Sequence, residues 1–498
     1  MSNRHLDRRA LLLAGAGIAT TAALTTFEPA AAGSSTRKVL RGHFGPTNSQ
    51  DWHYLPFQVP KGVRQIEVSY SYPPTVPGPG YSQNVIDIGI FDPPGNGLGN
   101  AQGFRGWSGG ARTSFKLSKT SATPGYVPGP ITPGRWRIAL GPYQVISRVD
   151  YEVTITLHFG KSGTAFVPTP APVEVTGTGQ GWYRGDLHVH TVHSDGSQTQ
   201  VDVLGYAKAA GLDFIGTSEH NTSSATQTWG RYVPDDFLVI PGEEVTTRAG
   251  HWLATGIPAG TWIDWRYTDD ENLARFTQQV RKAGGIAIAA HPNVPVPSIR
   301  WDFEPTFAAM DAIEVWNGPW SGTNAATNQA ALRRWHELLT AGTFKPAVGN
   351  SDTHRESNAI GRAQTVVRAE GLSAAAIIAG YRGGHSWIAE SSAVDLHFTA
   401  TLEDVSGQCG DRVPSDPGQQ VAVHLDVSGV PDCTATLLGP GLTSFGTATA
   451  VDGTITLDAM VPGGTPFVRA EVRRGTSSIS PMVALTNPIF LTAVSAEG

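Results

Sequence analysis

The sequence predicts a multidomain protein in which an α/β domain lies between two β domains. Three observations support this fold class. Residues 33–160 alternate apolar and polar side chains with period two, which is typical of half-buried strands. From about residue 179, short β-branched runs alternate with amphipathic helical segments, and after about residue 394 the period of two returns. A chain of 498 residues is long enough for two to four domains.

Residues 1–32 are expected to be an export signal. Arg8 and Arg9 precede an apolar run, and Ala30–Ala32 offers the small residues that a signal peptidase prefers. The segment "DRRALLL" resembles a twin-arginine signal, although Leu stands where Phe and Lys are common. The apolar run is shorter than the roughly 20 residues of a spanning helix, so we expect an exported periplasmic or extracellular protein without a transmembrane anchor.

Residues 33–160 are expected to form an antiparallel β-sandwich-like domain. The segments "RQIEVSYSY" and "YEVTITLHF" alternate strictly, and Pro/Gly turns such as "PPTVPGPG" separate them. Trp136 and Tyr151 have the parity of buried positions, which favours core packing over an exposed carbohydrate platform. Residues 161–178 are rich in Pro, Gly and Thr and predict a linker.

Residues 179–394 carry the repeated strand–helix pattern. In "DDENLARFTQQVRKAGG", Leu273, Phe276, Val280 and Ala283 form one helical stripe, and the strand "IAIAAHP" follows at once. The helix "NQAALRRWHELLTAGT" with "KPAVGNSDTH", and "AQTVVRA" with "SAAAIIAGYRGG", repeat the alternation. Such units imply parallel strands, in a closed barrel or an open doubly wound sheet.

Residues 395–498 are expected to form a small C-terminal β domain, because "QVAVHLDVSG" and "FVRAEVRR" alternate with period two. This region holds both cysteines of the chain, Cys409 and Cys433. In an oxidising compartment they can form one structural disulfide, which would contribute about 3 kcal/mol. Neither lies near the histidine-rich segments, which argues against thiol catalysis and a cysteine-ligated zinc site.

Composition excludes one class of partner. The formal net charge is −6, and no run of Lys and Arg occurs beyond the first dozen residues. Nonspecific nucleic-acid affinity depends on a basic field that this chain lacks, so no standing nucleic-acid partner is expected.

The segment "GDLHVHTVHSDGS" is the densest group of chemically active residues, with three histidines and two aspartates. His188 and His190 are two positions apart, so on an extended strand both point to one face. A lone His-x-His is usually two solvated imidazoles. Here, however, four later segments add further residues that can bind a metal. The segments "DFIGTSEHN", "FLVIPGEEVT", "IAIAAHP" and "PAVGNSDTH" each place a histidine or carboxylate beyond an apolar strand, where parallel α/β barrels gather functional groups. Imidazoles and carboxylates without cysteine suit Zn²⁺, Mn²⁺ or Fe²⁺.

These segments resemble a known family. "DLHVHTVHSDG", "SEHN", "PGEEVT", "AHP" and "NSDTH" follow, in order, the motifs of the polymerase and histidinol phosphatase (PHP) domain. "GHWLATG" and "IEVWNG" resemble the CehA/McbA branch of these metallohydrolases. The resemblance covers residues 182–390, and it implies a distorted (β/α)7 barrel with two or three divalent metal ions.

The resemblance also implies a ligand set. One metal would be held by His188, His190 and Asp352, and Glu244 would bridge it to a second metal held by His251 and His291. A third metal would be held by Asp195, His220 and His354. Asp195 stands where some relatives have histidine, so the third site is the least secure. The family pattern selects Glu244 over Glu243, which is expected to be an exposed or supporting neighbour.

The chemistry implied is hydrolysis by a metal-bound hydroxide. Two ions bridged by a carboxylate can share a hydroxide and clamp the oxygens of an in-line displacement. His193 stands where an aromatic residue is expected, and it supports the site or faces the substrate. Arg355 and Arg362 either stabilise a phosphate oxygen or are surface cations, and Asn317 either orients a water or caps a turn.

The function expected is an exported metal-dependent hydrolase acting on a small-molecule phosphomonoester or phosphodiester. One alternative is a carboxyl-ester, carbamate or amide hydrolase of the CehA/McbA type. A second alternative is a surface-polymer binding protein with a vestigial barrel. The nine intact ligand positions argue against the second alternative, because a decayed site would have lost several of them.

Overall fold

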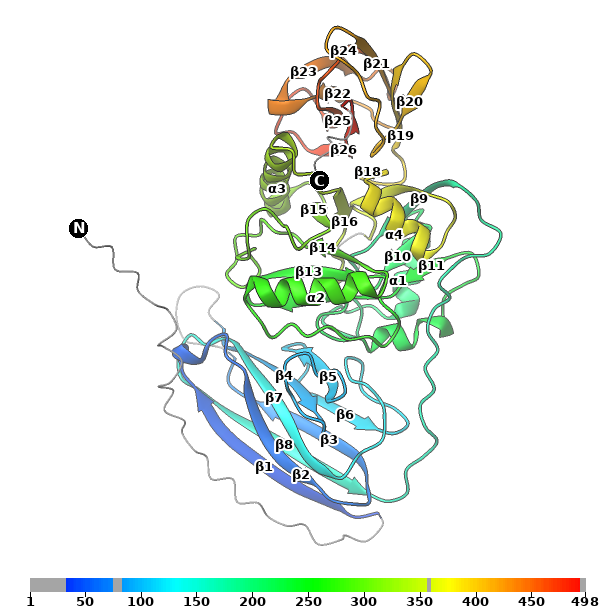
Figure 1. The fold of residues 1–498 in the computed structure, drawn as a ribbon. Helices are drawn as coiled ribbons and strands as arrows, with labels where there is room; N and C mark the ends of the chain where they lie inside the picture. Colours follow the sequence, from blue (N-terminus) through cyan, green and yellow to red (C-terminus); the bar gives the residue numbers. More distant parts are fainter. Residues whose placement is uncertain (1–32, 75–82, 356–359, 493–498) are drawn as a thin grey trace, which may run out of the picture.

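The computed structural model describes residues 33–74, 83–355 and 360–492, so the predicted export signal lies outside the described residues. The first β domain lies at one end of the molecule, the α/β domain in the middle and the last β domain at the other end (Figure 1). Among the described residues, no helix is both long and apolar enough to cross a membrane.

The first domain consists of two four-stranded antiparallel sheets, with the orders β1-β8-β3-β6 and β2-β7-β4-β5. Its strands are β1 (Ser35–Phe44), β2 (His53–Val59), β3 (Val63–Ser71), β4 (Val85–Phe91), β5 (Phe104–Gly109), β6 (Ser114–Ser118), β7 (Gly134–Gln144) and β8 (Val149–Phe159). Ile66 of β3 faces Leu157 of β8 across the ladder, and both are buried. Trp136 and Tyr151 are buried as well, which confirms their predicted place in the core.

The central domain contains two sheets and four α-helices. Its strands are β9 (Gly181–Asp186), β10 (Phe214–Gly216), β11 (Leu238–Ile240), β12 (Gly242–Thr247), β13 (Gly250–Thr255), β14 (Ile286–Ala289), β15 (Ala312–Asn317), β16 (Ala347–Asn350), β17 (Gln364–Ala369) and β18 (Ser386–Ala389). Its helices are α1 (Gln200–Ala209), α2 (Asp270–Lys282), α3 (Gly322–Thr340) and α4 (Ala374–Gly383).

Isolated bridges connect the two central sheets at both of their edges. His220 pairs with Glu244, and Val189 pairs with Thr353, through isolated parallel bridges. Because Pro241 alone separates β11 from β12, seven strand segments run in a ring from β9 through β10, β11/β12, β13, β14 and β15 to β16. The ring brings the ends of β9, β10 and β16 to one place.

Seven strand–helix units do not form, so the (β/α)7 expectation is not confirmed. The described residues contain only four α-helices. β12 and β13 form an antiparallel hairpin, which needs no crossover helix. The connections from β10 to β11 and from β14 to β15 contain no α-helix. Loops therefore replace helices on several sides of the ring.

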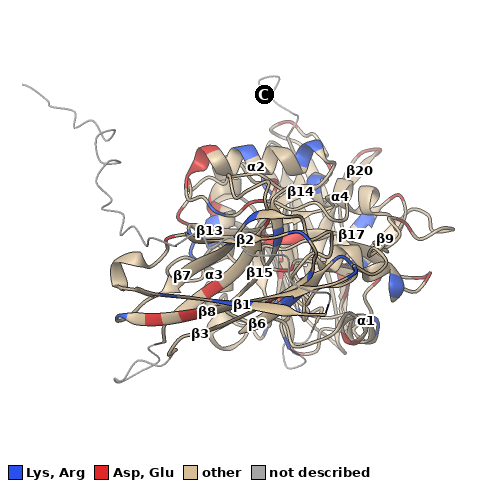
Figure 2. Ribbon diagram, turned by 90° about the horizontal axis from the view of Figure 1, so that it is seen from below, with Lys and Arg blue, Asp and Glu red and all other residues tan. Residues whose placement is uncertain are grey.

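Helix α2 follows the sequence pattern closely. The Asp269 side chain accepts a hydrogen bond from Asn272 N and caps the first turn. Leu273, Phe276 and Val280 are buried, as predicted, but Ala283, the fourth residue of the predicted stripe, is the C-cap and is exposed. Acidic residues occupy the first turn and basic residues the last turn, which suits the helix dipole (Figure 2). Elsewhere in Figure 2, positions of both signs are interspersed along the ribbon.

The last β domain is not separate from the central sheet. Its strands are β19 (Asp395–Leu402), β20 (Val405–Gly407), β21 (Gln420–Ser428), β22 (Cys433–Leu438), β23 (Ser444–Thr449), β24 (Thr454–Pro462), β25 (Phe467–Arg474), β26 (Met482–Thr486) and β27 (Ile489–Phe490). β26 pairs antiparallel with β18, so one sheet continues from the central domain into the last domain. Cys409 and Cys433 are both free and buried, so the expected disulfide is absent.

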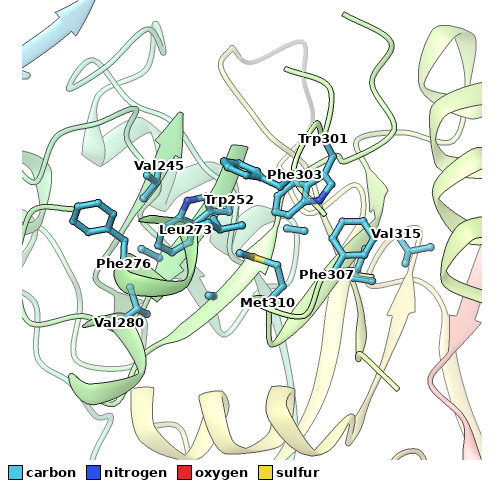
Figure 3. Packing of buried hydrophobic residues seen from close by; sticks show 14 of the residues in the cluster. Val245, Trp252, Leu273, Phe276, Val280, Trp301, Phe303, Phe307, Met310 and Val315 are labelled. Atoms are coloured by element: carbon cyan, nitrogen blue, oxygen red, sulfur yellow. The ribbon is translucent and has the colours of Figure 1, made fainter. Parts of the chain in front are cut away.

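One apolar core joins all three domains. Figure 3 shows its central part, where Trp252, Leu273 and Met310 pack together. The same cluster includes aromatic residues of the first domain, and the Phe104 ring stacks on Trp262 with centroids 4.2 Å apart. It also includes Phe467 of β25. The domains are therefore expected to unfold with strong coupling to one another.

Asn487 ties the last domain to the strand that precedes Asp352. Its Oδ1 accepts a bond from Ala347 N at 2.8 Å, and its Nδ2 donates to Ala347 O at 2.9 Å and to Ser386 O at 3.1 Å. Asn487→Ala leaves the N–H and C=O of buried Ala347 without these partners, while Ser386 O still accepts from the backbone N–H of residue 487, so it is expected to lower the free energy of unfolding by roughly 1–3 kcal/mol. Urea unfolding followed by tryptophan fluorescence measures this change. The exposed variant Val451→Ala is the control, and equal midpoints for the two variants would contradict the assignment.

Candidate metal centre

The segment after β9 presents two imidazoles to the centre of the ring. His188 and His190 are fully buried on one side of the extended chain. Leu187 and Val189 point to the other side and join two apolar clusters. The alternation that the sequence predicts thus separates the ligand-type side chains from the core-forming ones.

Glu244 of β12 is the central carboxylate of the site, and it is fully buried. Its Oε1 lies 2.9 Å from His251 Nδ1 and 3.2 Å from His291 Nε2. Its Oε2 lies 3.3, 3.4 and 2.9 Å from ring nitrogens of His188, His190 and His220. The two oxygens therefore face two different groups of imidazoles, which is the arrangement of a bridging carboxylate.

Asp352, which follows β16, is the second carboxylate of the site. Its Oδ1 lies 3.3 Å from the Nε2 atoms of His188 and His190 and 3.4 Å from His354 Nδ1. Its φ of 52° lies in the left-handed region, as does the φ of 29° at His291. Such backbone costs about 1–3 kcal/mol per residue and is concentrated at functional sites.

Asp195 is the third carboxylate, and it lies on the open side of the cluster. Its Oδ1 is 3.5 Å from His220 Nε2 and 3.3 Å from His354 Nε2. Its side chain is 44% exposed, whereas the side chains of His188 and Glu244 are 0% exposed. Solvent therefore reaches the cluster through the side where Asp195, His220 and His354 lie.

The structure thus brings all nine predicted ligands together. Three groups have ligand atoms that lie within 4.8 Å of one another, namely His188/His190/Asp352, His188/Glu244/His291 and His190/Asp195/His220/His354. The first group matches the predicted first site. The second group contains His188, whereas the predicted second site contains His251. His251 contacts this group through Glu244. The third group contains the predicted residues and His190.

Several polar atoms that face this centre have no hydrogen-bond partner among the described residues. They are His188 Nε2, His190 Nε2, Glu244 Oε2 and Asp352 Oδ1; the ring nitrogens of His251 and His291 that point away from Glu244 have no partner either within the described part of the chain. Buried polar atoms are normally satisfied, so a cluster of unsatisfied ones in one place needs a ligand. Imidazole and carboxylate donors at this spacing fit divalent metal ions.

The charges in the cluster shift its pKa values strongly. Burial alone would raise the pKa of Glu244, but the imidazoles of His220 and His188 outweigh it and hold that pKa well below the usual value. Burial likewise lowers the pKa of His220, but Glu244 and Asp195 raise it to about 10. The pKa of His188 is also raised, because three carboxylates outweigh its burial.

Glu314 of β15 orients two of the imidazole-bearing segments, and sequence reasoning did not identify it. Its Oε1 accepts a hydrogen bond from His188 Nδ1 at 3.1 Å, and its Oε2 accepts one from His291 N at 2.7 Å. Asn317 Nδ2 donates to Glu314 Oε2 at 3.0 Å and to Asp352 Oδ2 at 3.2 Å. Asn317 therefore holds a carboxylate directly. The signal available in the sequence was a lone glutamate inside the apolar strand "AIEVWN".

Asp186 is a second buried carboxylate that sequence reasoning missed. Its Oδ1 accepts bonds from His188 N and Ser351 N, both at 3.1 Å, and its Oδ2 accepts one from Gly361 N at 2.9 Å. Burial raises the pKa of Asp186 to about 6. It thereby fixes the first histidine segment against the segment that carries Asp352.

The remaining predicted residues lie beside the cluster. Glu243 is buried rather than exposed, because it points to the opposite face of β12 from Glu244, and its Oε2 accepts a bond from Ile263 N at 3.2 Å. His193 Nδ1 lies 2.9 Å from Ser224 Oγ, and it belongs to none of the three metal-type groups. Arg355 and Arg362 are exposed.

The first β domain borders the loops of this centre. Gly125 accepts a hydrogen bond from Thr222 Oγ1 at 2.8 Å and donates its N–H to Ser224 Oγ at 3.0 Å. Arg248, in the turn between β12 and β13, pairs with Asp87 of β4 at 3.2 Å. The loops that follow β10 and β12 are thus held by groups of another domain.

Comparisons with known proteins give weak likenesses. No protein-family model matches the chain. An uncharacterized protein of Methanocaldococcus jannaschii is 26% identical over 152 residues, which cover 27% of this chain and 81% of that protein.

Two solved structures are similar to the chain at low TM-scores. A two-domain protein of Bacteroides vulgatus, containing a predicted PHP-like metal-dependent phosphoesterase, is 19% identical, and the match covers 66% of this chain and 100% of that chain with a TM-score of 0.36. A Bacteroides uniformis beta-glucuronidase 2 is 9% identical, and the match covers 92% of this chain and 80% of that chain with a TM-score of 0.19. At such scores, neither protein's activity transfers to this chain by likeness alone.

Metal binding is expected to release protons. In the metal-free protein, His220, with a pKa of about 10, is protonated at neutral pH, and so is His188, whose pKa is raised. A metal ion binds the neutral ring, so it must displace these protons, and its affinity should rise with pH until His220 is neutral. Calorimetric titration with Zn²⁺ near pH 8 in two buffers of different ionisation enthalpy measures the release. Identical heats in both buffers would show that no proton leaves.

Proposed function

We propose that this protein is an exported metal-dependent phosphoesterase of the PHP superfamily, in its CehA/McbA-like branch. The observation that carries the proposal is the buried Glu244 carboxylate, which five imidazoles surround and which Asp352 and Asp195 flank. Zn²⁺, Mn²⁺ or Fe²⁺ suits these donors, in two or three sites. The polymer-binding alternative is disfavoured, because a vestigial site has no reason to keep so many unsatisfied polar atoms facing one point.

The ligands would be distributed as the motif order implies. His188, His190 and Asp352 would hold one ion, with Glu244 shared with a second ion held by His251 and His291. Asp195, His220 and His354, at the open side, would hold the third. A pair of bound divalent ions supplies an activated water and neutralises charge that develops on the substrate.

The protein's own groups prepare the ligands for this role. Glu314 accepts a bond from His188 Nδ1, which keeps the proton on that nitrogen and leaves Nε2 directed at the centre. Asn317 holds one oxygen of Asp352, so that the other oxygen faces the imidazoles. These contacts fix ring and carboxylate orientations before a substrate arrives.

The charge balance favours an anionic substrate. Asp195, Glu244, Asp352 and Glu314, which bonds to His188, carry four negative charges, and neutral imidazoles carry none. Two divalent ions would leave a net charge of about 0, and three would leave about +2. A phosphate ester is attracted to a centre with three ions, whereas a neutral carboxyl ester or carbamate gains less. Access is through the side of Asp195 and His354, and the exposed Arg355 follows His354 in the chain.

Ligand variants test the metal assignment. Glu244→Gln and Asp352→Asn are expected to lose bound metal and to lower turnover by more than the roughly 10–100-fold typical of partners that only orient a ligand. Glu314→Gln removes such a partner and should fall within that range. Elemental analysis and turnover, before and after chelation, measure both effects. Asp236→Asn changes an exposed aspartate and is the control. Full metal content and activity in either ligand variant would contradict the assignment of that residue as a metal ligand.

A substrate panel tests the ester class. The metal-loaded enzyme is assayed on a nitrophenyl phosphate, a bis-nitrophenyl phosphate, a nitrophenyl acetate and an aryl carbamate, with Asp352→Asn as the blank. We expect the larger kcat/KM on a phosphate, because a centre with three ions bound would carry net positive charge. The carboxyl-ester or carbamate alternative replaces this proposal if its kcat/KM exceeds both phosphates by about 100-fold, roughly 2.7 kcal/mol in transition-state stabilisation.

Export is proposed from residues 1–32 alone, namely the arginine pair, the apolar run and Ala30–Ala32. The mature protein is expected to begin near Gly33, and exchange of Arg8 and Arg9 for lysine is expected to block export by a twin-arginine route. Mass spectrometry of the secreted protein determines its N-terminus. Protein that stays in the cytoplasm with Met1 intact would contradict the proposal.

A further inference from the structure

A cavity of about 810 Å³ lies between α3 and the sheet of the last β domain, and none of its lining residues belongs to the metal centre. Its volume is within the roughly 300–1,000 Å³ of small-molecule sites. From α3, Arg333 and Glu337 are exposed at its edge, and their charges cancel. Most of the wall is apolar, with contributions from Leu332, Ala341, Leu438, Leu442 and Ile479.

The floor of this cavity carries charged residues where a packed strand normally carries apolar ones. Arg469, Glu471 and Arg473 are alternate residues of β25, so they share one face of the strand. They are only 0%, 8% and 5% exposed. Arg469 Nε donates to His336 Nδ1 of α3 at 3.1 Å, and its guanidinium lies 5.4 Å from the centre of the Trp335 ring.

The charges of the floor do not balance. Glu471 pairs with Arg469 Nη2 at 2.9 Å and with Arg473 Nε at 2.8 Å, so one carboxylate serves two guanidinium groups. Burial and the Arg469 charge lower the pKa of His336 to about 4, so this imidazole is neutral and adds no charge. Arg469 Nη1 has no hydrogen-bond or ion-pair partner among the residues that the structure describes. One buried positive charge is therefore left uncompensated, which is costly unless an anion completes it.

We propose that this cavity binds a small amphipathic anion, whose carboxylate or phosphate head pairs with the Arg469 and Arg473 guanidinium groups that share Glu471, and whose apolar body lies against Leu332, Leu438 and Leu442. A guanidinium presents a planar fork of N–H donors that matches either head group. The apolar walls favour a ligand with an apolar body, and the single uncompensated positive charge favours a ligand with one anionic head. The site is separate from the metal centre, so its test needs binding and no turnover.

The test uses the full-length protein and three probes that share one ten-carbon chain. Decanoate, decyl phosphate and decanol are titrated by calorimetry, below the concentrations at which they form micelles. At least one of the two anions is expected to bind with a Kd under about 1 mM, and decanol at least about 10-fold more weakly. The ratio of the two anion affinities identifies the preferred head group.

Variants place the binding in this cavity. Arg469→Gln removes the charge and is expected to weaken anion binding at least about 10-fold while leaving decanol unchanged. Leu442→Trp narrows the mouth at a residue that is 56% exposed, so it tests the site even if Arg469→Gln fails to fold. It is expected to weaken all three probes. Arg412→Gln changes an exposed arginine of the same domain that does not line the cavity, and it is expected to bind like the unaltered protein.

Three outcomes would overturn the proposal. The first is no binding of either anion up to about 1 mM, and the second is equal affinity for decanol and the anions. The third is undiminished anion binding in Leu442→Trp and in folded Arg469→Gln.

Discussion

The burial of the Glu244 carboxylate among imidazoles is the interaction on which the rest of the structure depends. A charged carboxylate removed from water is stable only where opposite charges and hydrogen bonds are held around it. Here the partners come from the chain after β9, β10 and β14 and from β13, so four segments distant in the sequence must be fixed to within an ångström or so of one another. Asp186 and Glu314 fix part of this arrangement, because Asp186 joins the His188 segment to the Asp352 segment and Glu314 joins it to His291. The left-handed backbone at His291 and Asp352 persists for the same reason.

Both flanking domains contact the strands and loops that carry the metal-centre residues. The first β domain contacts the loops that follow β10 and β12, through Gly125 and Asp87, and its aromatic side chains enter the largest apolar core. The last β domain extends the central sheet through the β18–β26 ladder, and Asn487 bonds to the first residue of β16. The loops beside the metal centre are therefore held partly by residues outside the region that resembles the PHP domain.

The structure and the sequence agree most where a residue's role follows from its own neighbours in the chain. His188 and His190 share a face because they are two apart on extended chain, and the burial of Leu273, Phe276 and Val280 follows from helical spacing. Agreement fails where the role depends on a distant strand. Glu314 looks like a misplaced charge in "AIEVWN" until β15 is placed beside the His188 segment. Glu243 looks exposed until Ile263 and its loop cover the opposite face of β12.

The sequence by itself determined the kinds of element in each domain, since periodicity is a local property of the chain, and its five ordered motifs resemble the PHP domain, which implied the nine residues that the centre contains. It also predicted that these nine residues would meet, because strand ends gather at one side of an α/β sheet. Only the tertiary structure decided the number of helices, since a connection becomes a hairpin or a loop according to the direction of the next strand. It left Cys409 and Cys433 without a disulfide, and it paired both Arg469 and Arg473 with Glu471 in the strand that lies beside α3. These features depend on the distances between groups far apart in the chain, and no local pattern contains such distances.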